Sequence, residues 1–73
     1  MLFKFVESST IVSVGYHNKV LTLYFKSGKV YNYFNVPKKH YFGLVEAKSV
    51  GSYFSKNIRD EFDSEILKVE VAV

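Results

Sequence analysis

The stretch IVSVGYHNKVLTLYFKSGKVYNYF, residues 11–34, contains three short segments rich in β-branched and aromatic residues. Segments of this composition, at 11–17, 20–25 and 30–34, are typical of β-strands. The first two are separated by Asn18-Lys19, and the last two by Lys-Ser-Gly-Lys at 26–29. Because both separators contain turn-forming residues, the pattern predicts a three-stranded antiparallel meander.

Two-residue turns at 18–19 and 27–28 would fix the register of this meander. Side chains alternate between the two faces of a sheet, so Tyr16 would face Leu21 and Val14 would face Leu23. The other pairs predicted on that face are Val12 with Phe25, Phe25 with Val30, and Leu21 with Phe34. The opposite face would then carry Ser13, Gly15, Thr22, Tyr24, Tyr31 and Tyr33.

Two helices are predicted after the meander. Pro37 suits a helix start, and residues 38–48 place Tyr41, Leu44 and Val45 at helical spacing, with Phe42 as a further inward candidate. Ser49 is a suitable N-cap for a second helix from Val50 to Arg59 or beyond. The apolar stripe of this second helix consists of Val50, Tyr53, Phe54, Ile58 and Phe62.

Both ends of the chain alternate between apolar and other residues, at 2–6 and 66–73. This period predicts strands that pair with the edges of the sheet or with each other. A disordered tail, or a strand that forms only on a partner, is the alternative. The chain is thus expected to be one domain, residues 1–73, of the α+β class. Its predicted architecture is a three-stranded antiparallel meander packed against two short helices, with extra terminal strands.

Charge is distributed unevenly along the 73 residues. Residues 1–59 hold nine basic and two acidic side chains, whereas residues 60–73 hold five acidic and one basic. A basic body suggests either phosphate or an acidic protein surface as partner, although solvated lysines explain it equally well. The acidic tail would compete with phosphate for this body, which favours a protein contact over a purely nucleic-acid one.

The motif Ser9-x-Ile11-x-x-x-Gly15-Tyr16, the Tyr31-x-Tyr33 pair, Val36-Pro37 and Ser49-Val50-Gly51-x-Tyr53-Phe54-x-x-x-Ile58 resemble the KTSC domain. The resemblance covers roughly residues 9–60. It implies a small α+β fold and a role in RNA binding, and it supplies no catalytic residues. A freestanding chain of this size also resembles a small phage-encoded transcription regulator. That likeness implies contact with the largest subunits of host RNA polymerase, inhibition of initiation, and antitermination.

Catalytic, cofactor and metal sites are not expected. The chain has no cysteine, and its two histidines lack nearby carboxylates at ligand spacing. The serines fit caps and turns better than a nucleophile paired with a base. No apolar run reaches the length of about 20 residues that a membrane span needs. We therefore expect a non-enzymatic, cytoplasmic protein, located in the host cytoplasm if it is phage-encoded, that does not bind membranes.

Candidate partner-binding residues fall into three groups. Tyr24, Tyr31 and Tyr33, with Lys26 and Lys29 at the hairpin, would form an aromatic platform for stacking bases, unless the helices cover that face and the rings are core. Lys38 and Lys39 open the first helix, where a bound anion would offset their unfavourable position. Phe3 and Phe5 lie on the N-terminal strand, whose edge could pair with a partner strand.

Three functions follow from these groups. The first is a monomeric regulator that binds RNA polymerase large subunits, the second is a module for RNA or single-stranded DNA, and the third is a structural appendage without a ligand.

Overall fold

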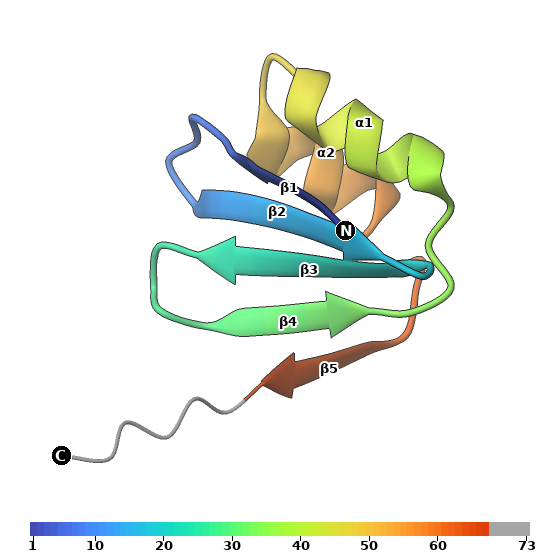
Figure 1. Ribbon diagram of the computed structural model, residues 1–73. Helices are drawn as coiled ribbons and strands as arrows, with labels where there is room; N and C mark the ends of the chain where they lie inside the picture. Colours follow the sequence, from blue (N-terminus) through green and yellow to red (C-terminus); the bar gives the residue numbers. More distant parts are fainter. Residues whose placement is uncertain (68–73) are drawn as a thin grey trace, which may run out of the picture.

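Residues 1–67 are described in the computed structural model, and they form a sheet with two helices on one side of it (Figure 1). The strands are β1 (Leu2–Phe5), β2 (Ile11–His17), β3 (Val20–Phe25), β4 (Val30–Tyr33) and β5 (Ser64–Leu67), and the helices are α1 (Lys38–Glu46) and α2 (Val50–Asn57). The strand order is β1-β2-β3-β4-β5, and all neighbours are antiparallel. The predicted α+β class, the central meander and both helices are confirmed.

The terminal strands lie at opposite edges of the sheet. β1 pairs with β2, and β5 returns after the helices to pair with β4. The predicted edge pairing is therefore confirmed for residues 2–5 and 66–67, and β5 begins two residues before the predicted strand. Strands β1 and β5 do not pair with each other. The part of the predicted C-terminal strand at residues 68–73 lies outside the described residues.

The first hairpin has the predicted register. Asn18 and Lys19 both adopt left-handed conformations, with φ of 53° and 65°, as a two-residue turn that matches strand twist requires. Tyr16 faces Leu21 and Val14 faces Leu23. Farther from the turn, the register shifts between Ile11 and Ser13. This bulge places Ile11 opposite Phe25, so the predicted pairing of Val12 with Phe25 is wrong.

The second hairpin differs from the prediction by one residue. The amide of Phe25 donates to the carbonyl of Lys29 over 2.9 Å, and Gly28 has a φ of 93°. The loop therefore holds three residues and closes on a left-handed glycine, a common hairpin geometry. Leu23 consequently faces Tyr31, and Leu21 faces Tyr33 instead of Phe34. Phe25 likewise does not pair with Val30, which lies opposite Tyr24.

The shift moves two tyrosines to the other side of the sheet. Tyr33 contacts Phe54 of α2 with ring centroids 5.6 Å apart, so its face is the one that the helices cover. Tyr31 shares that face with Tyr33, because residues two apart in a strand point the same way. The prediction that Tyr24, Tyr31 and Tyr33 share one face is therefore wrong, and Tyr24 alone lies on the opposite side.

The core fills the space between the sheet and the helices. Its buried side chains are Ile11, Val14, Tyr16, Leu21, Leu23, Tyr33, Val36, Tyr41, Leu44, Val50 and Ile58. The Tyr16 hydroxyl donates to the Val36 carbonyl over 2.6 Å, which gives a buried polar group a partner. On α1 the predicted burial of Tyr41 and Leu44 is confirmed, whereas Phe42 is 45% exposed and does not point inward.

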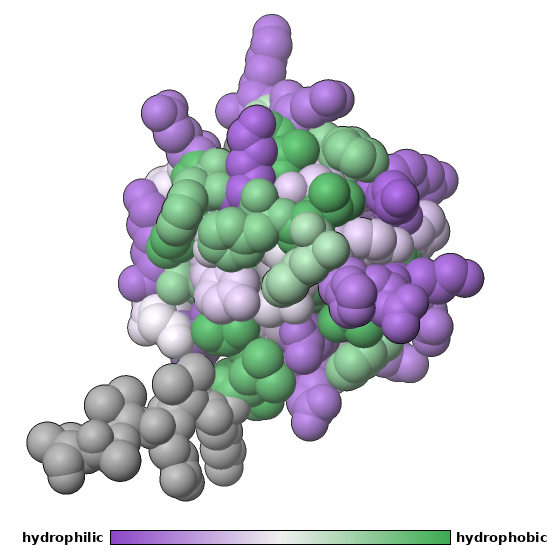
Figure 2. Space-filling model, viewed as in Figure 1, coloured by the Kyte–Doolittle hydropathy of each residue, from purple (hydrophilic) through white to green (hydrophobic). Residues whose placement is uncertain are grey.

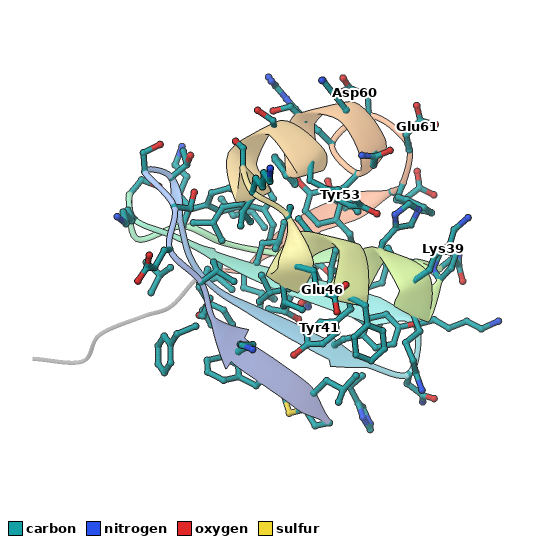
Figure 3. All side chains as sticks on the ribbon, turned by 90° about the horizontal axis from the view of Figure 1, so that it is seen from above. Lys39, Tyr41, Glu46, Tyr53, Asp60 and Glu61 are labelled. Atoms are coloured by element: carbon teal, nitrogen blue, oxygen red, sulfur yellow. The ribbon has the colours of Figure 1, made fainter. Side chains whose placement is uncertain are left out.

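Tyr53 fixes the contact between the helices, where Figure 3 shows it between α1 and α2. Its hydroxyl lies 3.0 Å from His40 Nδ1, and a Cβ at Gly43 would collide with its ring. Glycine in a helix interior costs about 1 kcal/mol relative to alanine. Here it allows the ring of one helix to touch the backbone of the other. The predicted cap of α2 is also present, because Ser49 Oγ accepts from the amide of Ser52.

Candidate functional site

One face of the sheet is left open by the helices. Two rows of side chains cross it from β1 to β5, and we call the ten residues the open face. The first row is Phe5, Ser13, Tyr24, Val30 and Leu67; the second is Phe3, Gly15, Thr22, Asn32 and Glu65. Phe3 and Tyr24 contact each other with centroids 6.0 Å apart, which confirms that they share this side.

The open face exposes more large apolar surface than a covered sheet would. Phe3 is 48% exposed and Phe5 is 70% exposed, although their rings touch each other edge to face. Figure 2 shows hydrophobic side chains gathered over the strands, with hydrophilic side chains around them. Contiguous apolar patches of this kind are typical of binding surfaces.

Gly15 and two small polar residues lie beside these rings on the open face. A Cβ at Gly15 would lie 3.8 Å from the Phe3 ring, so Phe3 covers the backbone of β2. Thr22 Oγ1 donates to Asn32 Oδ1 over 2.6 Å in the middle of the same row. The polar side chains at the centre of the open face are therefore partnered with each other.

Positive charge is absent from the two rows of the open face. Lys26 and Lys29 are exposed at the β3–β4 loop, at one end of the sheet. The two lysines predicted to accompany the tyrosines therefore lie at the end of the sheet, outside the open face. The rows themselves include one acidic residue, Glu65 on β5.

Tyr31 and Tyr33 line a different feature, which we call the aromatic hollow. It has a volume of about 330 Å³ and is lined by Phe25, Tyr31, Tyr33, Phe54, Arg59 and Asp60. Burial raises the pKa of Tyr33, Tyr31 and Asp60 raise this pKa further, and Arg59 opposes them. The sequence offered Tyr31 and Tyr33 as candidates, whereas Phe25, Phe54, Arg59 and Asp60 come from separate elements and could not be grouped without the fold.

The two lysines of α1 stand apart from both features. Lys38 and Lys39 are exposed in the first turn of α1, on the helix side of the molecule. The first turn has no acidic residue to offset them. Burial, and then the charge of Lys39, lowers the pKa of His40. The nine predicted partner-binding residues are therefore distributed over the open face, the aromatic hollow, the β3–β4 loop and the start of α1.

Residues 1–67 lack two further kinds of feature. They contain no group of three or more histidine, cysteine or acidic side chains placed to hold a metal ion. No helix of this part of the chain is long and apolar enough to cross a membrane.

Comparison with known proteins assigns this chain to a family. The profile of the KTSC domain matches residues 7–62, a span that includes β2 to α2 and the Tyr31-x-Tyr33 pair. The chain belongs to the KTSC domain family. The resemblance inferred from the sequence motifs is thereby confirmed.

Two individual KTSC relatives agree with this assignment. A lysine–tRNA ligase of Nostoc punctiforme is 41% identical over 63 residues, which are 84% of this chain and 11% of the ligase. This KTSC chain thus spans about a tenth of that relative's length. The crystal structure of a KTSC domain protein from Yersinia pestis is similar with a TM-score of 0.86 and 29% identity. The match covers 92% of this chain and 97% of that one.

Proposed function

We propose that this KTSC domain is a non-enzymatic transcription regulator that binds RNA polymerase through its open face, inhibiting initiation and promoting antitermination. The observation that carries the proposal is the exposure of Phe3 and Phe5 beside Tyr24, on the side of the sheet away from the helices. Aromatic rings that lose water on contact are the side chains that dominate protein interfaces.

Charge favours a protein over a nucleic acid as the partner of the open face. Single-strand-binding sheets combine stacking rings with cations that follow the phosphate backbone. The two rows of the open face hold Glu65 and no lysine or arginine, so phosphates would cross it without compensation. An apolar protein surface needs no such compensation.

The edge of the sheet supports the same partner class. Within residues 1–67, β1 is hydrogen-bonded on one side only, to β2, and it presents Phe3 and Phe5 at this edge. A partner strand could add to β1 by main-chain hydrogen bonds while its side chains meet the two rings. The open face and the β1 edge would then form one continuous contact.

A second candidate is RNA or single-stranded DNA. Two observations favour it: exposed rings on a sheet can stack bases, and a relative carrying this domain is a lysine–tRNA ligase. In this case Phe3, Phe5 and Tyr24 would stack bases, and Lys26 and Lys29 would contact phosphates at the hairpin.

The deciding experiment is a pull-down from bacterial lysate with the tagged chain, with and without nuclease. We expect the large polymerase subunits to be recovered in both conditions. The Phe3→Ala/Phe5→Ala variant should lose most of this recovery. Phe42→Ala is the matched control, because Phe42 on α1 is 45% exposed and Phe3 is 48% exposed.

The same variants separate the two candidates. Loss of the polymerase after nuclease treatment would contradict direct contact and favour nucleic acid. Binding of a labelled single strand should then fall steeply with salt, because each phosphate contact releases counterions. Equal polymerase recovery by the Phe3→Ala/Phe5→Ala variant and by Phe42→Ala would rule out the open face as the contact surface.

A further inference from the structure

The four rings of the aromatic hollow form a closed circuit. Phe25 contacts Tyr31 and Phe54 at centroid distances of 5.7 and 5.6 Å, with interplanar angles of 86° and 71°. Tyr33 closes the circuit by contacting Phe54 at 5.6 Å and Tyr31 at 6.2 Å. The rings come from β3, β4 and α2, so the circuit exists only in the folded chain.

These rings are not all part of the buried core. Tyr33 is 4% exposed, whereas Phe25, Tyr31 and Phe54 are half-buried against the core. Three of the four rings therefore keep surface available to a ligand in the hollow. An aromatic ring offers the negative pole of its quadrupole at its face, and several rings around one space favour a cation there.

The rim of the hollow supplies one carboxylate for such a cation. Arg59 and Asp60 both line the hollow, and Asp60 lies with Glu61 beyond the end of α2, as Figure 3 shows. The lining of the hollow thus contains one base and one acid, whereas Glu65 lies on the other side of the sheet. The Asp60 carboxylate is the anionic group that a cation in the hollow would meet, and Arg59 opposes its effect.

We propose that the aromatic hollow binds an alkylated ammonium, held by the four rings and by the Asp60 carboxylate. The group has two sources with one chemistry: a methylated lysine of a partner protein, or a free quaternary amine. This site is separate from the open face and does not depend on the polymerase proposal. Aromatic cages are the usual means of recognising quaternary ammonium groups.

Titration with tetramethylammonium, followed by the NMR signals of the Tyr31 and Tyr33 rings, tests the site. We expect saturable shifts at both rings. The neutral isostere 3,3-dimethylbutanol should bind roughly fivefold more weakly or worse. A peptide with trimethyllysine, compared with the same peptide carrying unmodified lysine, distinguishes the two sources. Preference for the methylated peptide over tetramethylammonium indicates a protein partner, and the reverse indicates a free amine; either result supports the site.

Two charge variants give the site its signature. Asp60→Asn should weaken tetramethylammonium binding roughly threefold to fivefold, and Arg59→Gln should strengthen it. Glu46→Gln is the matched acidic control, because Glu46 lies on α1 away from Asp60 (Figure 3), and it should change nothing. A nucleotide ligand would reverse the signs of the first two effects.

Three results would overturn the proposal. The first is equal binding of the neutral isostere, which would make the hollow a purely apolar pocket. The second is stronger shifts of the same rings by adenosine monophosphate, with tighter binding in Asp60→Asn. The third is no saturable shift by any cation while the spectrum of the chain is that of a folded protein.

Discussion

The two faces of the sheet are built from the same strands and differ in almost every other respect. On the helix side, Val14, Leu21 and Leu23 are fully buried. On the open face, alternate residues of the same strands lie beside Phe3 and Phe5, which keep 48% and 70% of their surface in water. One face thus supplies the core of a small domain, and the other leaves large rings exposed for contact with a partner.

The largest expected difference between the faces is in the free energy of unfolding. Leu23→Ala removes a fully buried side chain and should lower it by about 2–5 kcal/mol. Phe5→Ala removes a ring that is 70% exposed and should change it by about 0.5 kcal/mol. Urea denaturation of both variants measures the difference. Because Leu23→Ala is expected to remove much of the stability of a small domain, Ile11→Val serves as a milder core variant. It should lower the free energy of unfolding by about 0.5–1.5 kcal/mol. Similar losses in Phe5→Ala and Leu23→Ala would mean that the open face is part of the core.

Gly43 and Gly15 lie on opposite sides of the sheet, and substitution by alanine should change stability in opposite directions at the two positions. Gly43→Ala places a Cβ against the Tyr53 ring, and overpacking of about 1–3 kcal/mol should outweigh the gain of about 1 kcal/mol in helix propensity. Gly15→Ala meets its neighbours at 3.8 Å and should stabilise the strand by roughly 0.5 kcal/mol. Thermal unfolding of the two variants gives the signs. A stabilised Gly43→Ala would show that Tyr53 moves aside at little cost.

The smallest expected effect is a pH dependence on the helix side. The pKa of His40 is lowered by burial and by Lys39, so the folded state binds its proton less readily than the unfolded state. The resulting stabilisation is complete above the ordinary histidine pKa and is lost as the pH falls through the lowered value. Acidification from pH 7.5 to 5.5 should therefore reduce stability, and His40→Gln should reduce this dependence. An unchanged slope in His40→Gln would assign the effect to other groups.

Much of this architecture was predictable from the sequence, because hydrophobic period and turn residues are local signals. Asn18-Lys19 fixed the first hairpin, and Ser49 marked the start of α2. The prediction of the second hairpin was wrong, because Lys26-Ser27-Gly28-Lys29 accommodates turns of two or three residues. The choice between these turns decides on which face of the sheet the side chains of β4 lie.

The candidate sites were less predictable, since each combines distant elements. The contact between Phe3 and Tyr24 could be predicted only once β1 was known to pair with β2. The aromatic hollow needed Phe54 of α2 to meet Tyr33 of β4. The bulge at Ile11 has no marker in the sequence such as a glycine, so the alternation along β2 could not locate it.

The most direct test of the open face is to map where RNA polymerase touches the folded chain. Cross-saturation NMR with labelled chain and purified polymerase reports this contact residue by residue. Binding through the open face predicts saturation transfer to residues of β1 and to Thr22 and Tyr24 of β3, with little transfer to α1 and α2. Transfer confined to the two helices, or no transfer at concentrations that retain polymerase in the pull-down, would contradict it.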